Sequence, residues 1–426
     1  MGRHKERRAS FIRWGTTSGR CVGCLHGLLF AILLLIATTV NAWDPQPFRR
    51  DGELSGRDFD YNERSFLNRF TYRYRPERAL DWRRHPEGFR GTGGSVRNSE
   101  LYIEENLRLR RTIEGPLDFL FRHELSEDFD GGYTRSLIGV RYDEGSRWSF
   151  QVLGDPVNEK EDVDIFLEAL CDLGDTGYLR WALVLPDAFF NGKAQTLRYT
   201  REPYTLFAET WLTSVRGVEG GGWINWNHPL ELWRVDADTV FEYQQLSGGL
   251  EISIGSEQVG MVTVEAEIEH GEREAELRDV QAAVNGVSLT RDYSLVGVRV
   301  ARRLDSNVVL WGGYRELRFD EADQGYVDIR QSRDIERLDR IAYMGLNWQV
   351  NPRVLLWPGV YVAFLDNEDI LIDVEGVDAV TSDNVVGKLA VPVEVSFERA
   401  SVTLNATFHL DKARWGGGNI QMQVPF

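Results

Sequence analysis

The chain has 426 residues, with 49 Lys and Arg residues against 66 Asp and Glu residues and a formal net charge of -17. Hydrophobic residues make up 42% of the sequence and aromatic residues 12%. This acidic balance argues against nucleic acid as a partner, because the phosphate backbone repels an acidic protein. The length fits either several soluble domains or one large all-β barrel.

The first 42 residues have the pattern of a secretory signal peptide. Basic residues crowd the first 20 positions, the apolar run Leu28–Ala37 follows, and Val40-Asn41-Ala42 stands at the cleavage position. We therefore predict cleavage before Trp43. The apolar run is too short to span a bilayer as a helix. Cleavage leaves about 384 residues with a net charge of about -22.

Cysteine usage excludes a disulfide framework. Cys21 and Cys24 lie within the predicted signal peptide, so only Cys171 remains in the mature chain. A lone cysteine also argues against a redox centre or a cysteine-based metal site. We expect no cofactor and no bound metal. No later stretch approaches 18 consecutive apolar residues, so the sequence predicts no transmembrane helix.

Long segments of the chain alternate between apolar and polar residues. The alternation is clear in four segments: 163–171, 342–350, 389–397 and 402–410. A period of two is typical of a β-strand with one apolar face. Each segment has about ten residues, the length that a tilted strand needs to cross hydrocarbon. Strands of soluble β-proteins are usually about half as long, so we favour a membrane barrel over a soluble periplasmic β-protein.

Turn signals agree with a barrel in which every second connection is tight. Tight turns are predicted at 399–400, 351–352, 305–306, 271–272 and 247–248, and longer connections at 411–417, 367–387, 321–336 and 217–229. Phe66–Arg75 is predicted as an early strand. The predicted fold is an all-β, up-and-down antiparallel transmembrane barrel of about 18 strands, within a range of about 16 to 20. Its predicted divisions are a signal peptide (1–42), a periplasmic extension (43–64) and the barrel (65–426).

The C-terminal residues carry the most specific local pattern. The chain ends in Ile420-Gln421-Met422-Gln423-Val424-Pro425-Phe426, with apolar side chains at every second place counted back from Phe426. This resembles the C-terminal strand of Gram-negative outer-membrane β-barrel proteins of the porin type, which the barrel-assembly machinery reads. The resemblance implies a place in the cell outer membrane, with outer-membrane lipid and lipopolysaccharide as neighbours. Pro425 departs from the pattern, because proline removes a donor from the hydrogen-bond ladder.

A glutamate-rich segment supplies the candidate lumen-lining residues. With a hairpin turn at 271–272, Glu269 would oppose Glu274 and Glu267 would oppose Glu276. Like charges directly opposite destabilise a sheet, so these pairs indicate compensating arginines or a water-filled lumen. We expect such a ladder to favour cations, and a solvated face above the membrane is the alternative. The full candidate set is Glu265, Glu267, Glu269, Glu274, Glu276 and Arg278.

Arginine dominates the basic residues of the mature chain. Residues 43–98 hold 12 Arg and no Lys. The planar guanidinium fork suits carboxylate, phosphate and sugar-acid groups. We therefore regard Arg69, Arg73 and Arg75 as candidate residues of a lumen plug or an anion site. A disordered periplasmic leader is the alternative.

No catalytic motif stands out. The mature chain has no G-x-S-x-G, H-E-x-x-H, P-loop or C-x-x-C-H pattern. Of its histidines, His123 falls on the apolar phase of its strand and His409 on the polar phase. We expect no enzyme. The sequence favours a channel or export pore for hydrophilic solutes or polysaccharide. The alternative is a barrel without transport that anchors a surface polymer or a protein, and the oligomeric state is open.

Overall fold

The computed structural model describes residues 88–425, with gaps at 97–99, 129–130, 156–163, 186–187, 189–196, 202, 214–216, 236–238, 257–259, 278–285, 326–330, 374–375 and 411–412. Phe66–Arg75, predicted as a strand, lies outside the described residues, as do the predicted signal peptide and periplasmic extension. Among the described residues there is no helix long and apolar enough to cross a membrane.

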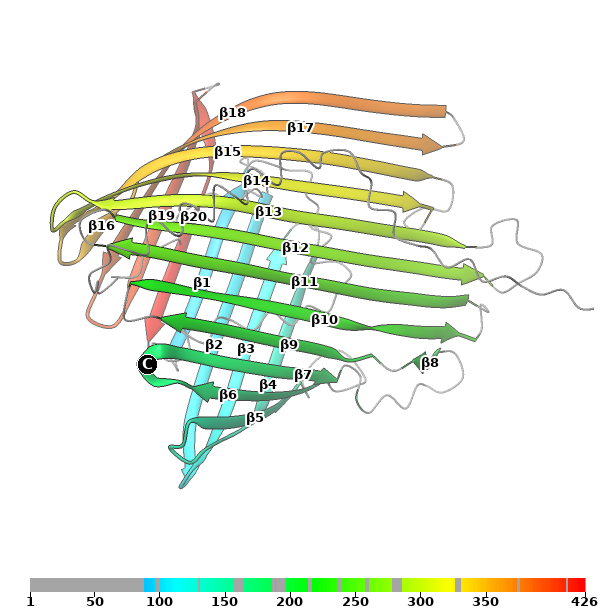
Figure 1. Cartoon of the computed structure of the whole chain (residues 1–426), viewed down its shortest axis with the longest axis horizontal. Helices are drawn as coiled ribbons and strands as arrows, with labels where there is room; N and C mark the ends of the chain where they lie inside the picture. The colour runs from blue at the N-terminus through cyan, green and yellow to red at the C-terminus, as the bar shows by residue number, and fades with distance from the viewer. Residues whose placement is uncertain are drawn as a thin grey trace, which may run out of the picture. The chain divides into compact units, whose positions relative to one another are not determined.

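Strands dominate the described part of the chain and belong to one antiparallel sheet (Figure 1). The segments are β1 (Gly88–Val96), β2 (Glu100–Glu114), β3 (Leu117–Asp128), β4 (Gly131–Asp143), β5 (Trp148–Gly154), β6 (Ile165–Asp172), β7 (Gly177–Leu185), β8 (Leu197–Arg201), β9 (Thr205–Thr213), β10 (Val218–Arg234), β11 (Thr239–Ser256), β12 (Gly260–Leu277), β13 (Val287–Arg303), β14 (Val308–Gln324), β15 (Ser332–Asn351), β16 (Val354–Leu356), β17 (Gly359–Asp373), β18 (Gly376–Ser396), β19 (Ser401–His409) and β20 (Arg414–Pro425). A 3-10 turn, η2 (Gly174–Thr176), joins β6 to β7.

The sheet closes on itself because β1 pairs with both β2 and β20. Two pairs of segments are single strands with a short interruption. β8 and β9 both pair with β10, and β16 and β17 both pair with β15 and β18. Pro203 and Pro358 lie in these interruptions, where proline cannot donate to the ladder. The result is a closed antiparallel barrel of 18 strands, which confirms the predicted fold.

The two ends of the barrel differ in their connections. At the end where Gly88 lies opposite Pro425, every connection between strands has two to four residues. The predicted turns at 399–400, 351–352 and 305–306 all lie at this end and are confirmed. Connections at the other end reach 11 residues, between β7 and β8. Outer-membrane barrels have short periplasmic turns, so the first end is the periplasmic end.

Two predicted turns were wrong. Residues 271–272 and 247–248 lie in the middle of β12 and β11, which pair without interruption from Thr239 opposite Leu277 to Ser256 opposite Gly260. The connection between these strands is 257–259. Glycine at 271 and 248 suggested a turn, but hydrogen-bond ladders on both sides of each strand outweigh that local preference.

The long connections predicted at 367–387 and 217–229 were also wrong. β17 and β18 continue to Asp373 and Gly376, so that only 374–375 joins them, and β10 runs from Val218 to Arg234. Acidic residues in the first segment and glycines in the second weakened the strand pattern. A solvated strand face tolerates both kinds of residue, so neither excludes a strand.

The two faces of the barrel wall have opposite chemistry. On β13 the side chains of Val296, Val298 and Val300 are 53%, 41% and 48% exposed, whereas Arg299 between them is 4% exposed. The same inversion holds on β5, where Phe150 is exposed and Ser149 is buried. Apolar side chains therefore form an outer belt, and polar side chains face the interior, as in a barrel surrounded by lipid.

Several strands continue beyond this belt at the end opposite the short turns. Along the outer face of β12, Ile268 is followed by His270 and Glu272, and on β17 Phe364 is followed by Asp366. β10–β15 and β18 have 17 to 21 residues, more than the roughly ten that cross hydrocarbon. Figure 1 shows β10–β15 side by side, and the charged ends of the long strands lie outside the lipid.

Glycines on the inner face make room for large aromatic rings. A Cβ at Gly345 would collide with the Trp311 ring, and one at Gly313 would collide with the ring of Tyr343. Trp311 and Tyr343 belong to a buried inner cluster that also contains Tyr361. Each ring therefore lies against the backbone of a neighbouring strand. It covers the backbone at a glycine, which has no side chain to do so.

Candidate functional site: the charged inner wall

The charged residues of one buried network come from four strands of the inner wall. The Arg180 guanidinium on β7 donates to Glu168 on β6 at 2.6 Å and lies 3.8 Å from Glu209 on β9. Arg122 on β3 approaches the same Glu168 at 3.6 Å, and Gln151 on β5 donates to it as well. All four charged side chains are less than 10% exposed. Opposite charges alternate along the network, which offsets the cost of desolvation.

The contact between Arg122 and Glu168 also indicates that the wall is bent. Their strands, β3 and β6, are separated by β4 and β5 in the sheet. The side chains meet because the inner wall bends sharply there. A buried apolar cluster fills the same bend: Leu120, Leu137, Leu153, Phe166, Ala182, Val184 and Phe207.

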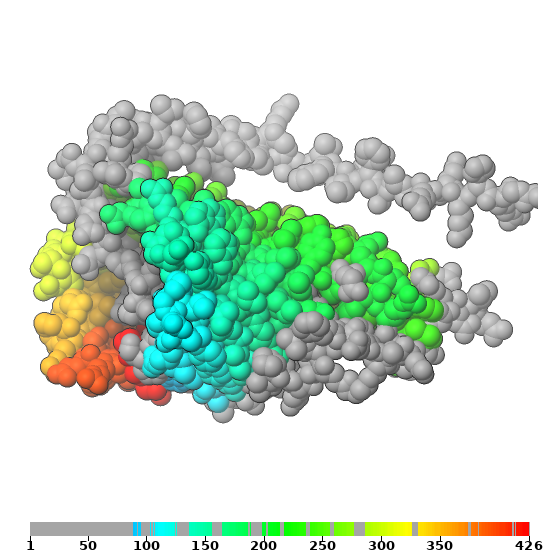
Figure 2. Space-filling view, turned by 90° about the horizontal axis from the view of Figure 1, so that it is seen from below, coloured from blue at the N-terminus to red at the C-terminus, as the bar shows by residue number. Residues whose placement is uncertain are grey.

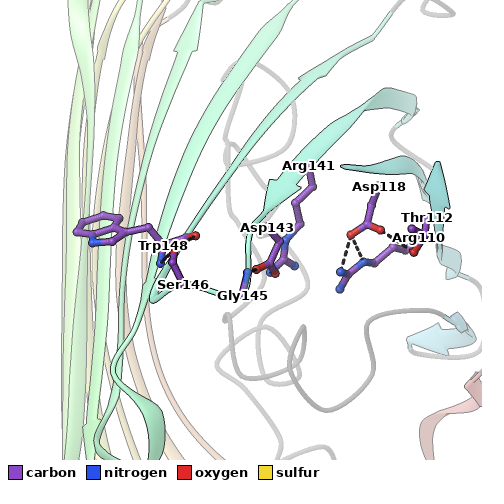
Figure 3. A network of polar contacts seen from close by, with 8 residues as sticks. All are labelled: Arg110, Thr112, Asp118, Arg141, Asp143, Gly145, Ser146 and Trp148. Carbon is purple, nitrogen blue, oxygen red and sulfur yellow. Dashed lines mark hydrogen bonds and ion pairs between the residues drawn. The ribbon is translucent and has the colours of Figure 1, made fainter. Parts of the chain in front are cut away.

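A second network lies near the short turns (Figure 3). Arg110 and Thr112 on β2 donate to the carboxylate of Asp118 on β3 at 2.6 and 2.9 Å. Arg141 donates to Asp143 on β4 at 2.7 Å. Figure 3 shows the exposed Trp148 ring pointing away from these charged side chains, on the other side of the sheet. The network therefore borders the periplasmic opening of the lumen.

Arginines on the opposite part of the wall contact both carboxylates and rings. Arg315 on β14 donates to Glu265 at 2.5 Å, and its guanidinium lies 5.4 Å from the centre of the Tyr343 ring. Arg299 lies 5.6 Å from the Trp311 ring, and Arg273 lies 5.3 Å from the Tyr243 ring. Such stacking holds a guanidinium flat against the wall.

The predicted lumen-lining glutamates fall on two different faces of β12. Glu265, Glu267 and Glu269 share the inner face with the buried Thr263 and Arg273, whereas Glu274 and Glu276 are exposed on the outer face. The predicted pairing across 271–272 was wrong, because all five residues belong to one strand. Arg278 lies outside the described residues, and so do Arg69, Arg73 and Arg75.

The register creates other like-charge pairs in place of the predicted ones. Glu251 on β11 lies directly opposite Glu265 on the inner face, and Glu242 lies opposite Glu274 on the outer face. The donation from Arg315 to Glu265 compensates the inner pair. The sequence left open compensation by arginines of neighbouring strands, and here the arginine comes from β14, on the far side of β13.

Sequence reasoning missed the network of Arg122, Glu168, Arg180 and Glu209. Each of these residues lies on the polar phase of its strand, and the alternation alone could have assigned it to the inner face. Their contacts join different strands and depend on the register and curvature of the sheet, which no local pattern displays. Among the residues that the structure describes, no cluster of three or more metal-ligating side chains occurs.

Comparison with known proteins yields structural likeness only. No family model and no curated protein matches the chain. Among solved structures, the chain is similar to OccK11 of Pseudomonas aeruginosa, with 11% identity, a TM-score of 0.36, and coverage of 79% of this chain and 93% of that one. It is also similar to the outer-membrane channel DcaP of Acinetobacter baumannii, with 10% identity, a TM-score of 0.35, and coverage of 80% and 96%.

A bacterial polysaccharide outer-membrane secretin is similar at 9% identity and a TM-score of 0.33, with coverage of 80% of this chain and 98% of that one. The closed sheet, its even number of strands and its apolar outer belt define the class independently. The chain is a bacterial outer-membrane β-barrel protein.

Proposed function

We propose that the barrel is a channel or export pore for small hydrophilic solutes or polysaccharide. The observation that carries the proposal is the polar lining of the interior, in which charged residues occur on strands from β2 to β18. A barrel that transports nothing could be filled with apolar side chains, which would avoid the free-energy cost of desolvating charged residues. Barrels of about 18 strands are wide enough to enclose an aqueous lumen.

Selectivity in such a pore depends on the side chains that line it. Glu265, Glu267 and Glu269 on the inner face of β12 form the proposed cation-attracting row. Arg69, Arg73 and Arg75 remain the proposed plug or anion-binding residues. Outer-membrane lipid, lipopolysaccharide and the barrel-assembly machinery are the proposed partners, and no catalytic step belongs to this function.

Solute flux into liposomes tests the transport proposal. The purified mature protein is reconstituted, and swelling rates are measured with a neutral sugar series and an acidic oligosaccharide. We expect flux that falls with solute size. Liposomes that remain tight to all of these solutes would contradict a pore. Deleting residues 43–60 tests the plug separately, because unchanged conductance would exclude a plug formed by that segment.

A second candidate function is an anchor for a surface polymer or a protein. The specific observation in its favour is the length of β10–β15 and β18, whose ends continue beyond the apolar belt. Such a projecting wall offers a binding surface outside the lipid. The liposome experiment separates the candidates: a folded barrel without flux favours the anchor.

A further inference from the structure

The outer face of β2–β4 carries a histidine and a serine among apolar side chains. Nδ1 of His123 on β3 lies 2.9 Å from Oγ of Ser136 on β4, and the two residues are directly opposite each other in the register. His123 shares its face with the exposed Leu117 and Phe119, and Ser136 shares its face with Ile138. The pair therefore points towards lipid and away from the lumen.

A carboxylate lies next to this pair. Leu107 on β2 is directly opposite His123, and Glu105 is two residues further along the same face of β2. Glu105 and His123 are thus diagonal neighbours, about 7–8 Å apart at Cα and within reach of a glutamate side chain. The register of three strands brings Glu105, His123 and Ser136 together on one lipid-facing surface.

The position of these residues argues against ordinary surface chemistry. Ile103, which is 46% exposed, lies beyond Glu105, so apolar side chains flank the polar residues on both sides along β2. Ionisable side chains that face lipid are costly and generally mark function. A serine and a histidine could form the same hydrogen bond on the inner wall. There they would not take the place of apolar side chains that contact lipid.

We propose that Ser136 and His123 form a nucleophile–base pair that acts on acyl esters of membrane lipids, with Glu105 as the positioning residue. This activity goes beyond the proposed transport function and does not depend on it. A fatty acyl ester is the substrate class that the surrounding lipid presents to this face. The pair lies in the half of the belt farther from the short turns, on the side of the outer leaflet.

The chemistry balances without any co-reactant except water. Ser136 Oγ attacks the ester carbonyl carbon while His123 takes the hydroxyl proton, and a C–O bond to the serine forms. The ester C–O bond then breaks, and His123 returns the proton to the leaving alkoxide. Water next attacks the acyl-serine, with His123 again as the base, to release the fatty acid. Glu105 would orient the imidazole and stabilise its charged form.

The rate is expected to be modest, because the backbone N–H groups of these strands are engaged in the ladder. Loss of one oxyanion donor in other hydrolases costs about 10²–10³-fold in kcat. Covalent trapping is therefore the more sensitive readout. The full mature protein in detergent is treated with an alkyl fluorophosphonate, and the modified residue is identified by peptide mass spectrometry.

We expect labelling at Ser136, and labelling reduced about 10²-fold or more in His123→Gln, because general-base assistance is worth about that factor. Ser288→Ala is the matched control: Ser288 also lies on the outer face, on β13, opposite Glu274 and with no histidine directly or diagonally across from it. The control variant should be labelled as the unmodified protein is. Absence of adduct at Ser136 would overturn the proposal.

Fatty acid release identifies the lipid. The protein is reconstituted into vesicles of phospholipid alone or of phospholipid with lipopolysaccharide, and released acids are measured by mass spectrometry. Release from both kinds of vesicle indicates phospholipid esters, and release that requires lipopolysaccharide indicates its ester-linked chains. Ser136→Ala should abolish release while it leaves the gel shift of the folded form unchanged, which shows that the barrel is folded. No release above that of Ser136→Ala in either vesicle contradicts the proposed activity.

Glu105→Gln tests the positioning role. We expect kcat to fall about tenfold with KM unchanged, because the carboxylate does not contact the substrate. A purely structural role would instead alter neither kinetic constant in the folded variant, and that result would remove Glu105 from the proposal.

Discussion

Arg180 and Glu168 form an ion pair at 2.6 Å on the inner wall, with side chains only 4% and 3% exposed. Arg122 and Glu209 contact the same pair from the other two strands. These four charges lie at the bend of the wall between β3 and β9. Removing one of them would leave its partner buried and out of reach of water.

Arg180→Met should destabilise the barrel by about 3–5 kcal/mol, because it leaves Glu168 and Glu209 buried with less compensation. Urea unfolding in detergent, followed by tryptophan fluorescence, measures the change. Arg318→Met is the matched control, since Arg318 pairs with Asp320 at an exposed position (62% and 34%) and should cost no more than about 1 kcal/mol. Equal losses of unfolding free energy in the two variants would show that the buried network stabilises the barrel no more than an exposed ion pair does.

The outer belt can be tested with one substitution at two heights of β13. Val298→Arg places a guanidinium within the apolar belt and should cost about 2–4 kcal/mol. Thr290→Arg lies on the same outer face, beyond the belt, opposite Ala322 and Glu272, and should cost about 0–1 kcal/mol. Folding into lipid vesicles, measured by the gel shift of the folded form and by equilibrium unfolding, distinguishes them. A larger loss at 290 than at 298 would contradict the assigned height of the membrane.

The close approach of Trp311 to Gly345 predicts a strong response to a single methyl group. Gly345→Ala would push a Cβ into the Trp311 ring and the carbonyl oxygen of Pro358. We expect a loss of about 1–3 kcal/mol from overpacking. Gly271→Ala is the control, because its Cβ would meet nothing closer than 3.9 Å. Thermal unfolding in detergent measures both, and a stable Gly345→Ala variant would mean that the ring is not held against the strand.

The glutamates of β12 offer a test of ion selectivity with an internal control. Glu267→Gln combined with Glu269→Gln removes inward charge and should shift the reversal potential in a salt gradient towards anion preference. Glu274→Gln with Glu276→Gln removes the same number of charges from the outer face and should leave the reversal potential unchanged. Planar bilayer recordings supply the measurement. Anion preference of the unmodified protein would refute the idea of a cation-attracting row.

The sequence by itself determined the class of fold. A period of two assigns side chains to opposite faces whatever the partner strand is, so the alternation in 389–397 or 402–410 was enough to predict strands with one apolar face. Length then separated membrane strands from ordinary ones, and the tight turns near 399–400, 351–352 and 305–306 followed from local residue preferences.

Only the tertiary structure decided the register, the extent of the strands and the contacts across the wall. Gly271 looked like a turn residue because local preference was all that the sequence displayed, while the ladder to β11 and β13 is a non-local interaction. For the same reason neither the contact of Arg122 with Glu168 nor that of Ser136 with His123 could be anticipated. Shifting one strand by two residues keeps every side chain on its face but changes each of its neighbours, so chemistry between strands is invisible until the register is known.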